Sequence, residues 1–301
     1  MQIPKPTSLF AITLLFALGV IWGSGYVIAK YCVMHGVPAL GYSFWQSLGP
    51  AVVLTVITLL KRDSHFHCSW RYWRYYLMCG ILGIAFPNTL MYFAARHLPA
   101  GILAVLVNTV PIITFPLALI FQQERFHWQR MLAVVLGVIG IMLIVIPDVA
   151  WRNNAHWFWI LLVLFTPLSF ALCTVFIAAF RPVPSDSLSL SAGMLVVSAI
   201  LLAPITFGLG KFHALTHFTL PNSLIVLEIV LSSIGYLLFF MLIKRAGPVY
   251  YSLVGGVVTI TGLFWGWLIF HEIFSVRIVI AVFAILAAIG WLSFKLKRNS
   301  Q

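Results

Sequence analysis

The sequence predicts an all-α integral membrane protein with ten transmembrane helices. Three observations predict this class: the 301 residues are 62% hydrophobic, only 8% are charged, and the mean hydropathy is +1.06. Soluble domains carry about 25% charged residues. The hydrophobic residues come in long continuous blocks, as helices surrounded by lipid require, and not on one helix face. They also lack the alternation over ~10 residues that is typical of a transmembrane β-barrel strand.

Ten blocks are long enough to cross a bilayer, which takes roughly 20 helical residues. They span residues 8–33, 38–60, 74–95, 99–121, 128–147, 156–180, 187–209, 222–243, 247–270 and 276–296. The first block is too long for the hydrophobic region of a signal peptide and carries no small-residue cleavage motif. We therefore interpret it as the first membrane span, and the short loops leave no room for a soluble domain.

Basic residues divide unequally between the two sides of the predicted membrane. Alternating the loops places most of the 18 Lys and Arg on one side, namely Lys5, Lys61, Arg62, Arg71, Arg74, Arg125, Arg130, Arg181, Lys244, Arg245, Lys295, Lys297 and Arg298. The positive-inside rule then predicts that both termini lie in the cytoplasm. We attribute the net charge of +12 to this bias and expect no nucleic-acid partner.

Two acidic residues indicate an internal repeat. Glu124 and Glu272 both follow a hydrophobic block, at an offset of 148 residues, and each precedes a Phe by two positions. The same offset pairs Arg96 with Lys244. We therefore predict two five-helix repeats, residues 1–150 and 151–301. Because five is odd, the second repeat would enter the membrane from the opposite side, an inverted topology typical of secondary transporters.

Three stretches carry a resemblance to a known family. They are "IWGSGYVIAK" at 21–30, the segment 85–126 that begins "AFPNTLMYF", and "SSIGYLLFFMLIKRAG" at 232–247. Over nearly its whole length the chain resembles the drug/metabolite transporter superfamily, in particular the EamA-type transporters with ten transmembrane helices. That family usually has Gly-Glu after its fourth and ninth helices, whereas this chain has Gln123-Glu124 and His271-Glu272. The resemblance implies membrane transport of small organic metabolites.

The two repeated carboxylates are also predicted to be structural. Each lies in a short turn before a helix, where a carboxylate can accept hydrogen bonds from unpaired backbone N–H groups and complement the helix dipole. We predict that Glu124 caps the fifth helix and that Glu272 caps the tenth. A role in proton coupling is the alternative.

Charged residues inside the membrane are candidates for substrate contact, because burying a charge in a bilayer is costly. Glu228 lies inside the eighth helix, with Ser232 and Tyr236 on the same face. It would bind a substrate cation, carry a proton, or be a carboxylate satisfied within the bundle. Lys30 ends the first helix and would hold an anionic group, or extend to the outer interface.

Further candidates are polar and aromatic side chains within the blocks. They are Trp22, Tyr26, Gln46, Asn88, Tyr92, Asn108 and Thr259. Three of them, Trp22, Tyr26 and Tyr92, are suited to stacking on a ring or a cation. Trp and Tyr also form interfacial belts, and glycine-rich faces also permit close helix packing, so structural roles stay open.

These residues together predict a secondary transporter that works by alternating access in a bacterial inner membrane. Amino acids or similar zwitterions are the favoured substrates, because Lys30 and Glu228 supply both charges. Export of lipophilic organic cations, bound by Glu228 and the aromatic residues alone, is the alternative. A channel or a membrane scaffold is the alternative from a different class.

An enzyme is not expected. The "GSG" at 23–25 would suit a serine hydrolase, but the nine histidines fall in loops or at helix ends, away from that serine. We expect no cofactor and no metal, since the four cysteines are scattered and "HFHC" at 65–68 lacks a ligand set. The expected partners are the lipid bilayer, a small-molecule substrate and a second copy of the chain, with the fifth and tenth helices as the dimer contact.

Overall fold

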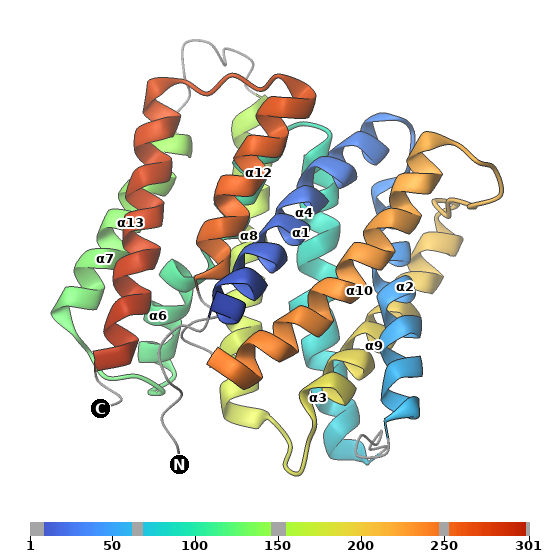
Figure 1. Ribbon diagram of the computed structural model, residues 1–301, viewed down its shortest axis with the longest axis horizontal. Coiled ribbons are helices and arrows are strands. Elements are labelled where there is room, and N and C mark those ends of the chain that lie inside the picture. The colour runs from blue at the N-terminus through green and yellow to red at the C-terminus, as the bar shows by residue number, and fades with distance from the viewer. Residues whose placement is uncertain (1–8, 62–68, 146–154, 247–252, 299–301) are drawn as a thin grey trace.

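The hydrophobic blocks form helices in the computed structural model, which describes residues 9–61, 69–145, 155–246 and 253–298 (Figure 1). No β-strand occurs within these residues. Eight helical stretches are long and apolar enough to cross a membrane, and two shorter apolar helices, Val254–Phe270 and Val276–Leu292, complete the set. The prediction of an all-α membrane protein with ten apolar helical segments is therefore confirmed. The beginning of the ninth predicted span and the "HFHC" stretch lie outside the described residues.

Two of the ten segments are interrupted, so the element labels outnumber the segments. The elements in chain order are α1 Leu9–Met34, α2 Ala39–Leu60, α3 Trp70–Gly80, η1 Ile81–Ala85, α4 Phe86–Ala95, α5 Ala100–Val107, α6 Val110–Ile120, α7 Trp128–Val145, α8 Ala155–Phe180, α9 Ser187–Gly208, α10 Leu220–Ala246, α12 Val254–Phe270 and α13 Val276–Arg298.

The third segment contains the π-helical turn η1 between α3 and α4. Pro87 follows η1 and has no N–H, so it cannot bond to the carbonyl of Leu82, five residues earlier. The hydroxyl of Ser169 on α8 donates to that carbonyl at 2.7 Å. A neighbouring helix therefore satisfies the backbone group that the proline leaves unpaired.

The fourth segment is broken between α5 and α6, just before Pro111. Asn108 and Thr109 lie in the break, and their side chains donate to the carbonyls of Ala104 and Leu106, both at 2.7 Å. Proline disfavours a continuous helix at this point, and the two polar side chains supply bonds to the last carbonyls of α5.

The helices of the two halves of the chain pack against each other. α2 packs along α9 and α7 along α13, at opposite edges of the molecule (Figure 1). Between them, α1 packs on α12 and α10, while α8 packs on α6 and α4. Exchanging the first five segments with the last five leaves this pattern of neighbours unchanged, as an internal repeat would require. The division at residues 150 and 151 stays a prediction.

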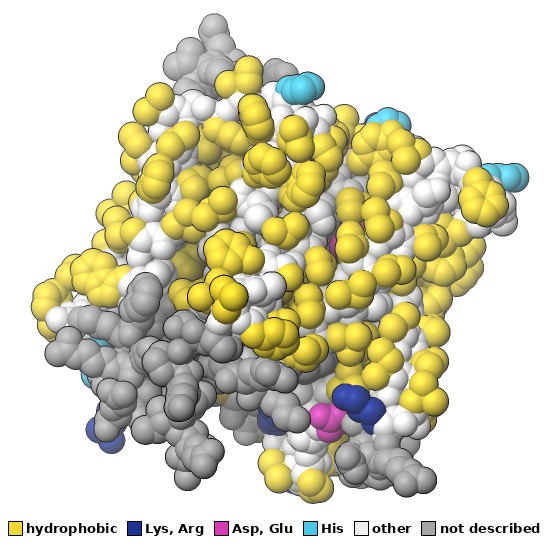
Figure 2. All heavy atoms as spheres, in the orientation of Figure 1, with side chains coloured by type: hydrophobic (Ala, Val, Ile, Leu, Met, Phe, Trp, Pro, Cys, Tyr) yellow, Lys and Arg dark blue, Asp and Glu magenta, His cyan; other side chains and the backbone are white. Residues whose placement is uncertain are grey.

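The two ends of the bundle differ. α1 begins and α13 ends at the same end, and the loop between α12 and α13 lies at the other (Figure 1). Figure 2 shows hydrophobic side chains over the broad face, basic side chains along the edge where α1 begins, and histidines at the opposite edge. This distribution suits a helix bundle embedded in lipid. The compartment of each end stays a prediction.

Candidate substrate site

Glu228 is a buried carboxylate within an apolar helix that is long enough to span a membrane. It lies on α10 and is 7% exposed. Its Oε1 atom accepts a hydrogen bond from Ser232, one turn later on the same helix, at 3.2 Å. The Oε2 atom contacts no hydrogen-bond donor among the described residues. Neither of the ion pairs found in the described part of the chain includes Glu228.

The neighbouring helix α2 extends this polar cluster. Gln46 is 7% exposed, its Oε1 lies 3.5 Å from the Ser232 hydroxyl, and its Nε2 lies 3.5 Å from the carbonyl of Ile225. These contacts are at the long limit of a hydrogen bond, so the amide is only weakly engaged. The structure therefore brings Gln46, Glu228 and Ser232 together, as three of the predicted site residues.

Two tyrosines pack together beside the part of α10 that carries Glu228. The rings of Tyr42 on α2 and Tyr92 on α4 meet edge to face, with centroids 4.7 Å apart. Both belong to one cluster of buried residues with Ile225, which precedes Glu228 by three positions on α10. Tyr42 is fully buried, and its hydroxyl contacts no partner within the described ranges. Buried tyrosine hydroxyls usually find a partner, so this O–H is a second group able to bind a ligand.

Helix α1 approaches Glu228 through a glycine. A Cβ atom added at Gly25 would lie 2.7 Å from Glu228 Oε1, so only glycine leaves room for the carboxylate. Gly25 ends the "GSG" stretch at 23–25, whose serine would be the nucleophile of a hydrolase. Its serine, Ser24, donates instead to the carbonyl of Ile21 on its own helix at 2.7 Å.

Aromatic rings lie further along the contact between α1 and α10. The ring centroid of Trp22 is 6.4 Å from that of Tyr236, in an edge-to-face arrangement, and 6.2 Å from that of Phe239. Trp22 packs over Gly235, where an added Cβ would lie 2.5 Å from the indole nitrogen. Trp22 and Tyr236 are half-buried, and Tyr236 shares a face of α10 with Glu228 and Ser232.

A third group of predicted residues joins α1, α5 and α12. The amide of Asn108 donates to the hydroxyl of Tyr26 at 3.3 Å, and its Oδ1 lies 3.3 Å from the position of a Cβ on Gly255. Thr259 is fully buried and donates to the Gly255 carbonyl of its own helix. Tyr26 and Asn108 are thus brought together, while Thr259 is engaged in a local bond.

Lys30 is not free to hold a substrate anion in this structure. Its ammonium group donates to the carbonyl of Leu98 at 2.9 Å and forms an ion pair with Glu272 at 3.1 Å. It also lies 5.0 Å from the ring centroid of Phe270. Its role as a substrate contact stays a prediction, but the structure provides it with a protein partner that the sequence did not indicate.

The two predicted helix caps have partners that differ from those expected. Glu272 accepts hydrogen bonds from the backbone N–H groups of Ala100 and Gly101, at 2.6 and 3.0 Å, and therefore caps α5. The prediction that it caps the tenth helix, α13, is wrong in this respect. Glu124 accepts a bond from the side chain of Arg130, in the first turn of α7, at 2.9 Å. Glu124 thus contacts the fifth segment by binding the Arg130 side chain, and not by capping backbone N–H groups.

Asn88 is separate from these clusters. It is half-buried on α4 and forms no hydrogen bond among the described residues. A surface groove of about 430 Å³ does not include Glu228 either. It lies between α2 and α9, is lined almost wholly by apolar side chains, and includes the lipid-exposed Val52 and Ile200. We place the site at Glu228 because the groove offers no charged group.

Sequence reasoning missed Tyr42 and Gly25. Tyr42 precedes Gln46 by four residues, so the helical repeat places the two on one face, and this signal was available. Gly25 precedes Lys30 within the first block, and its role depends on the approach of α10, which no local pattern encodes.

Comparisons with known proteins give one family model for the first half of the chain and one fold for nearly all of it. The sequence model of the EamA-like transporter family matches residues 9–146. A search of curated proteins found no match. Twenty solved chains match the structure. One, described only as "Crystal structure of protein", superposes with a TM-score of 0.66 over 96% of this chain and 98% of its own, at 14% identity. At that identity the likeness concerns the fold alone.

Proposed function

Residues 9–146 of this chain belong to the EamA-like transporter family, within the drug/metabolite transporter superfamily, and from this premise we propose a secondary transporter of small organic solutes. Members of this family are transporters and not enzymes. The transporter would work by alternating access in a bacterial inner membrane. A central site between α1, α2, α4 and α10 would bind the solute from one side and release it to the other.

One observation carries this proposal: Glu228 is buried within an apolar helix long enough to span a membrane, and one of its carboxylate oxygens has no hydrogen-bond partner among the described residues. An intramembrane carboxylate without an ion-pair partner is costly unless a ligand cation or a proton neutralises it. Tyr42 and Tyr92 pack in a cluster with Ile225, three residues before Glu228. Trp22 packs on Tyr236, two turns after Glu228 on α10. A carboxylate bordered by aromatic rings suits a substrate that carries an ammonium group.

The ion pair of Lys30 favours organic cations over zwitterions. A zwitterion such as an amino acid needs a cationic side chain for its carboxylate, and Lys30 is already paired with Glu272. We therefore propose lipophilic organic cations as the first substrate class. Amino acids and similar zwitterions remain the second class, which would require Lys30 to leave Glu272 when substrate binds.

Transport assays with purified protein in liposomes test the proposal. The assay would offer a radiolabelled lipophilic ammonium ion that carries N–H donors, phenethylammonium, and a set of radiolabelled amino acids. Glu228→Gln should weaken binding of the transported solute by roughly 1.5–3 kcal/mol, the range for a charge-assisted hydrogen bond. That corresponds to roughly ten- to hundredfold in affinity. Lys30→Met should weaken amino-acid binding far more than binding of the organic cation.

The control for this test is Glu124→Gln, which removes a carboxylate outside the site. It should leave affinity within about twofold of the parent protein. If Glu228 is a proton carrier, Glu228→Gln should keep binding but abolish the response of transport to a pH gradient. An unchanged rate, affinity and pH response in Glu228→Gln would assign the carboxylate a structural role. Uptake that lacks saturation and counterflow would favour a channel.

A further inference from the structure

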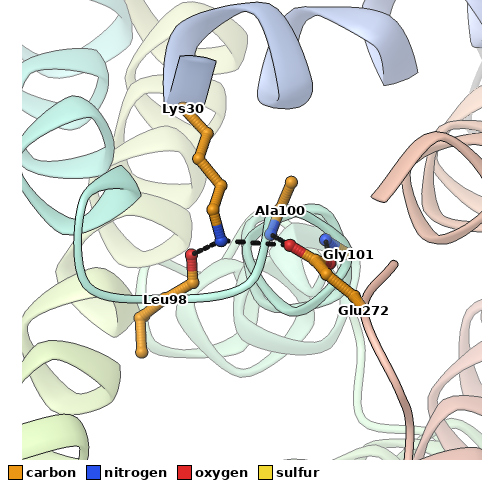
Figure 3. A network of polar contacts seen from close by, with 5 residues as sticks. All are labelled: Lys30, Leu98, Ala100, Gly101 and Glu272. Atoms are coloured by element: carbon orange, nitrogen blue, oxygen red, sulfur yellow. Dashed lines mark hydrogen bonds and ion pairs between the residues drawn. The ribbon is translucent and has the colours of Figure 1, made fainter. Parts of the chain in front are cut away.

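A group of five residues joins the two halves of the chain at one end of the bundle (Figure 3). We call it the Glu272 network, and its members are Lys30, Leu98, Ala100, Gly101 and Glu272. The Glu272 carboxylate accepts bonds from the N–H groups of Ala100 and Gly101 and from the Lys30 ammonium, at 2.6, 3.0 and 3.1 Å. Lys30 also donates to the Leu98 carbonyl at 2.9 Å.

The network connects three segments that are distant in the sequence. Lys30 lies near the end of α1, and Glu272 lies in the loop between α12 and α13. Leu98 lies in the turn between α4 and α5, and Ala100 and Gly101 are the first residues of α5. The side chains of Lys30 and Glu272 are 13% and 7% exposed, so water screens their attraction little. Hydrogen bonds between ionised groups in such a setting are about twice as strong as neutral ones.

The matching carboxylate of the first half makes a different contact. Glu124 stands at the offset of 148 residues from Glu272, but its ion pair with Arg130 stays within its own half. Its side chain is 36% exposed. One of the two related carboxylates therefore ties the halves together, and the other does not.

We propose that the Glu272 network is a gate that holds the transporter closed at this end of the bundle. The inference rests on the proposed function, since a gate has meaning only for a protein that opens alternately to two sides. Separating the start of α5 from the α12–α13 loop breaks the hydrogen bonds from Ala100 and Gly101 to Glu272. It leaves the buried charge of the Glu272 carboxylate without these partners. The network therefore contributes to the free-energy difference between the state closed at this end and the state open there.

Glycine at position 266 is required for the gate to close. A Cβ added to Gly266 would lie 2.4 Å from Glu272 Oε2 and 3.1 Å from the backbone nitrogen of Gly101. Any larger residue at position 266 would push the Glu272 carboxylate away from the start of α5. Gly266→Ala therefore disturbs the network while both of its charges remain.

Access of a thiol reagent to the interior tests the gate without any substrate. The reporter is Tyr26→Cys, in a protein whose native cysteines are replaced by alanine. Tyr26 is buried, 8% exposed, and lies one helical turn inside Lys30 on the same face. A membrane-impermeant maleimide is applied to spheroplasts and to inverted membrane vesicles, so that each end of the bundle faces the reagent in one preparation.

Glu272→Gln should raise the labelling rate roughly tenfold, because a charge-assisted hydrogen bond corresponds to about one decade in an equilibrium constant. The increase should occur only in the preparation that exposes the Glu272 end. Gly266→Ala and Lys30→Met should also raise the labelling rate. They serve as the test variants if Glu272→Gln does not fold. Glu124→Gln is the matched control and should leave the rate unchanged.

Three results would overturn the gate: equal labelling of the parent and the folded Glu272, Gly266 and Lys30 variants, an increase in both preparations, or an equal increase in Glu124→Gln. The first would assign the network to static packing and the other two to general loosening of the bundle. Because labelling needs no solute, the gate can fail while the solute panel still identifies a transporter. Conversely, the solute panel can fail to identify a transported solute while the labelling rates still support the gate.

Discussion

His271 occupies a backbone conformation that favours glycine. It ends α12 with φ 51° and ψ 38°, in the left-handed region. EamA-type transporters usually have glycine before this glutamate, so the departure noted in the sequence falls on a residue that bears strain. In the first half, the left-handed residue is Gln122, with φ 56°, two positions before Glu124. The left-handed turn reverses the chain after α12 and directs Glu272 toward α5.

Replacing His271 tests this strain. A side chain in the left-handed region costs roughly 1–2 kcal/mol, which exceeds the roughly 0.5–1 kcal/mol that glycine loses in conformational entropy. His271→Gly should therefore raise the melting temperature in detergent, and His271→Val should lower it. Ile273→Gly, at an exposed position of the same loop, is the control and should not stabilise. The explanation fails if His271→Gly and His271→Val melt at the same temperature.

At the scale of an element, the π-helical turn η1 depends on a neighbouring helix. Its Leu82 carbonyl cannot accept a hydrogen bond from Pro87, because proline has no N–H. It accepts one from the Ser169 hydroxyl instead. Thr166, on the same helix as Ser169, donates to the Pro87 carbonyl at 3.1 Å. Hydroxyls of α8 thus stabilise the irregular backbone of the third segment.

Ser169→Ala should lower stability by about 1 kcal/mol, because it leaves a carbonyl unpaired in a region without water. The measurement is the melting temperature of purified protein. Thr174→Ala is the control, since Thr174 bonds only to the Phe170 carbonyl of its own helix. A melting temperature of Ser169→Ala equal to that of the Thr174 variant would show that η1 needs no such partner.

At the scale of the molecule, the distribution of charge predicts its orientation. The end where α1 begins should face the cytoplasm, and the end with the Glu272 network should face outward. Single cysteines at Phe126 and Phe218, both exposed in loops, are suitable reporters. In intact cells, an impermeant maleimide should label Phe218→Cys and leave Phe126→Cys unlabelled.

Permeabilised cells provide the control for that labelling, because both positions should then react. The opposite pattern would invert the orientation, as would an external label in residues 61–73. Equal labelling of both positions in intact cells would contradict the predicted number of crossings between them. Either outcome would also remove the basis for assigning the Glu272 end to the outside.

The sequence alone determined the membrane class, the ten hydrophobic segments and the candidacy of Glu228. These follow from local properties: hydropathy over about one span length, the helical repeat, and the cost of a charge in lipid. The same local reasoning grouped Ser232 with Glu228, and the structure contains that hydrogen bond. Local patterns were sufficient because both residues lie on one helix.

Only the tertiary structure decided which distant groups meet. Glu272 was expected to cap the helix that follows it, but its partners are Ala100, 172 residues away, and Lys30, 242 residues away. A carboxylate after a helix can satisfy any unpaired N–H group within reach, so its type predicts capping without naming the helix. Tyr42 and Gly25 acquire their positions around Glu228 in the same way. Partners across a bundle depend on how whole helices pack and in which register, which no local periodicity specifies.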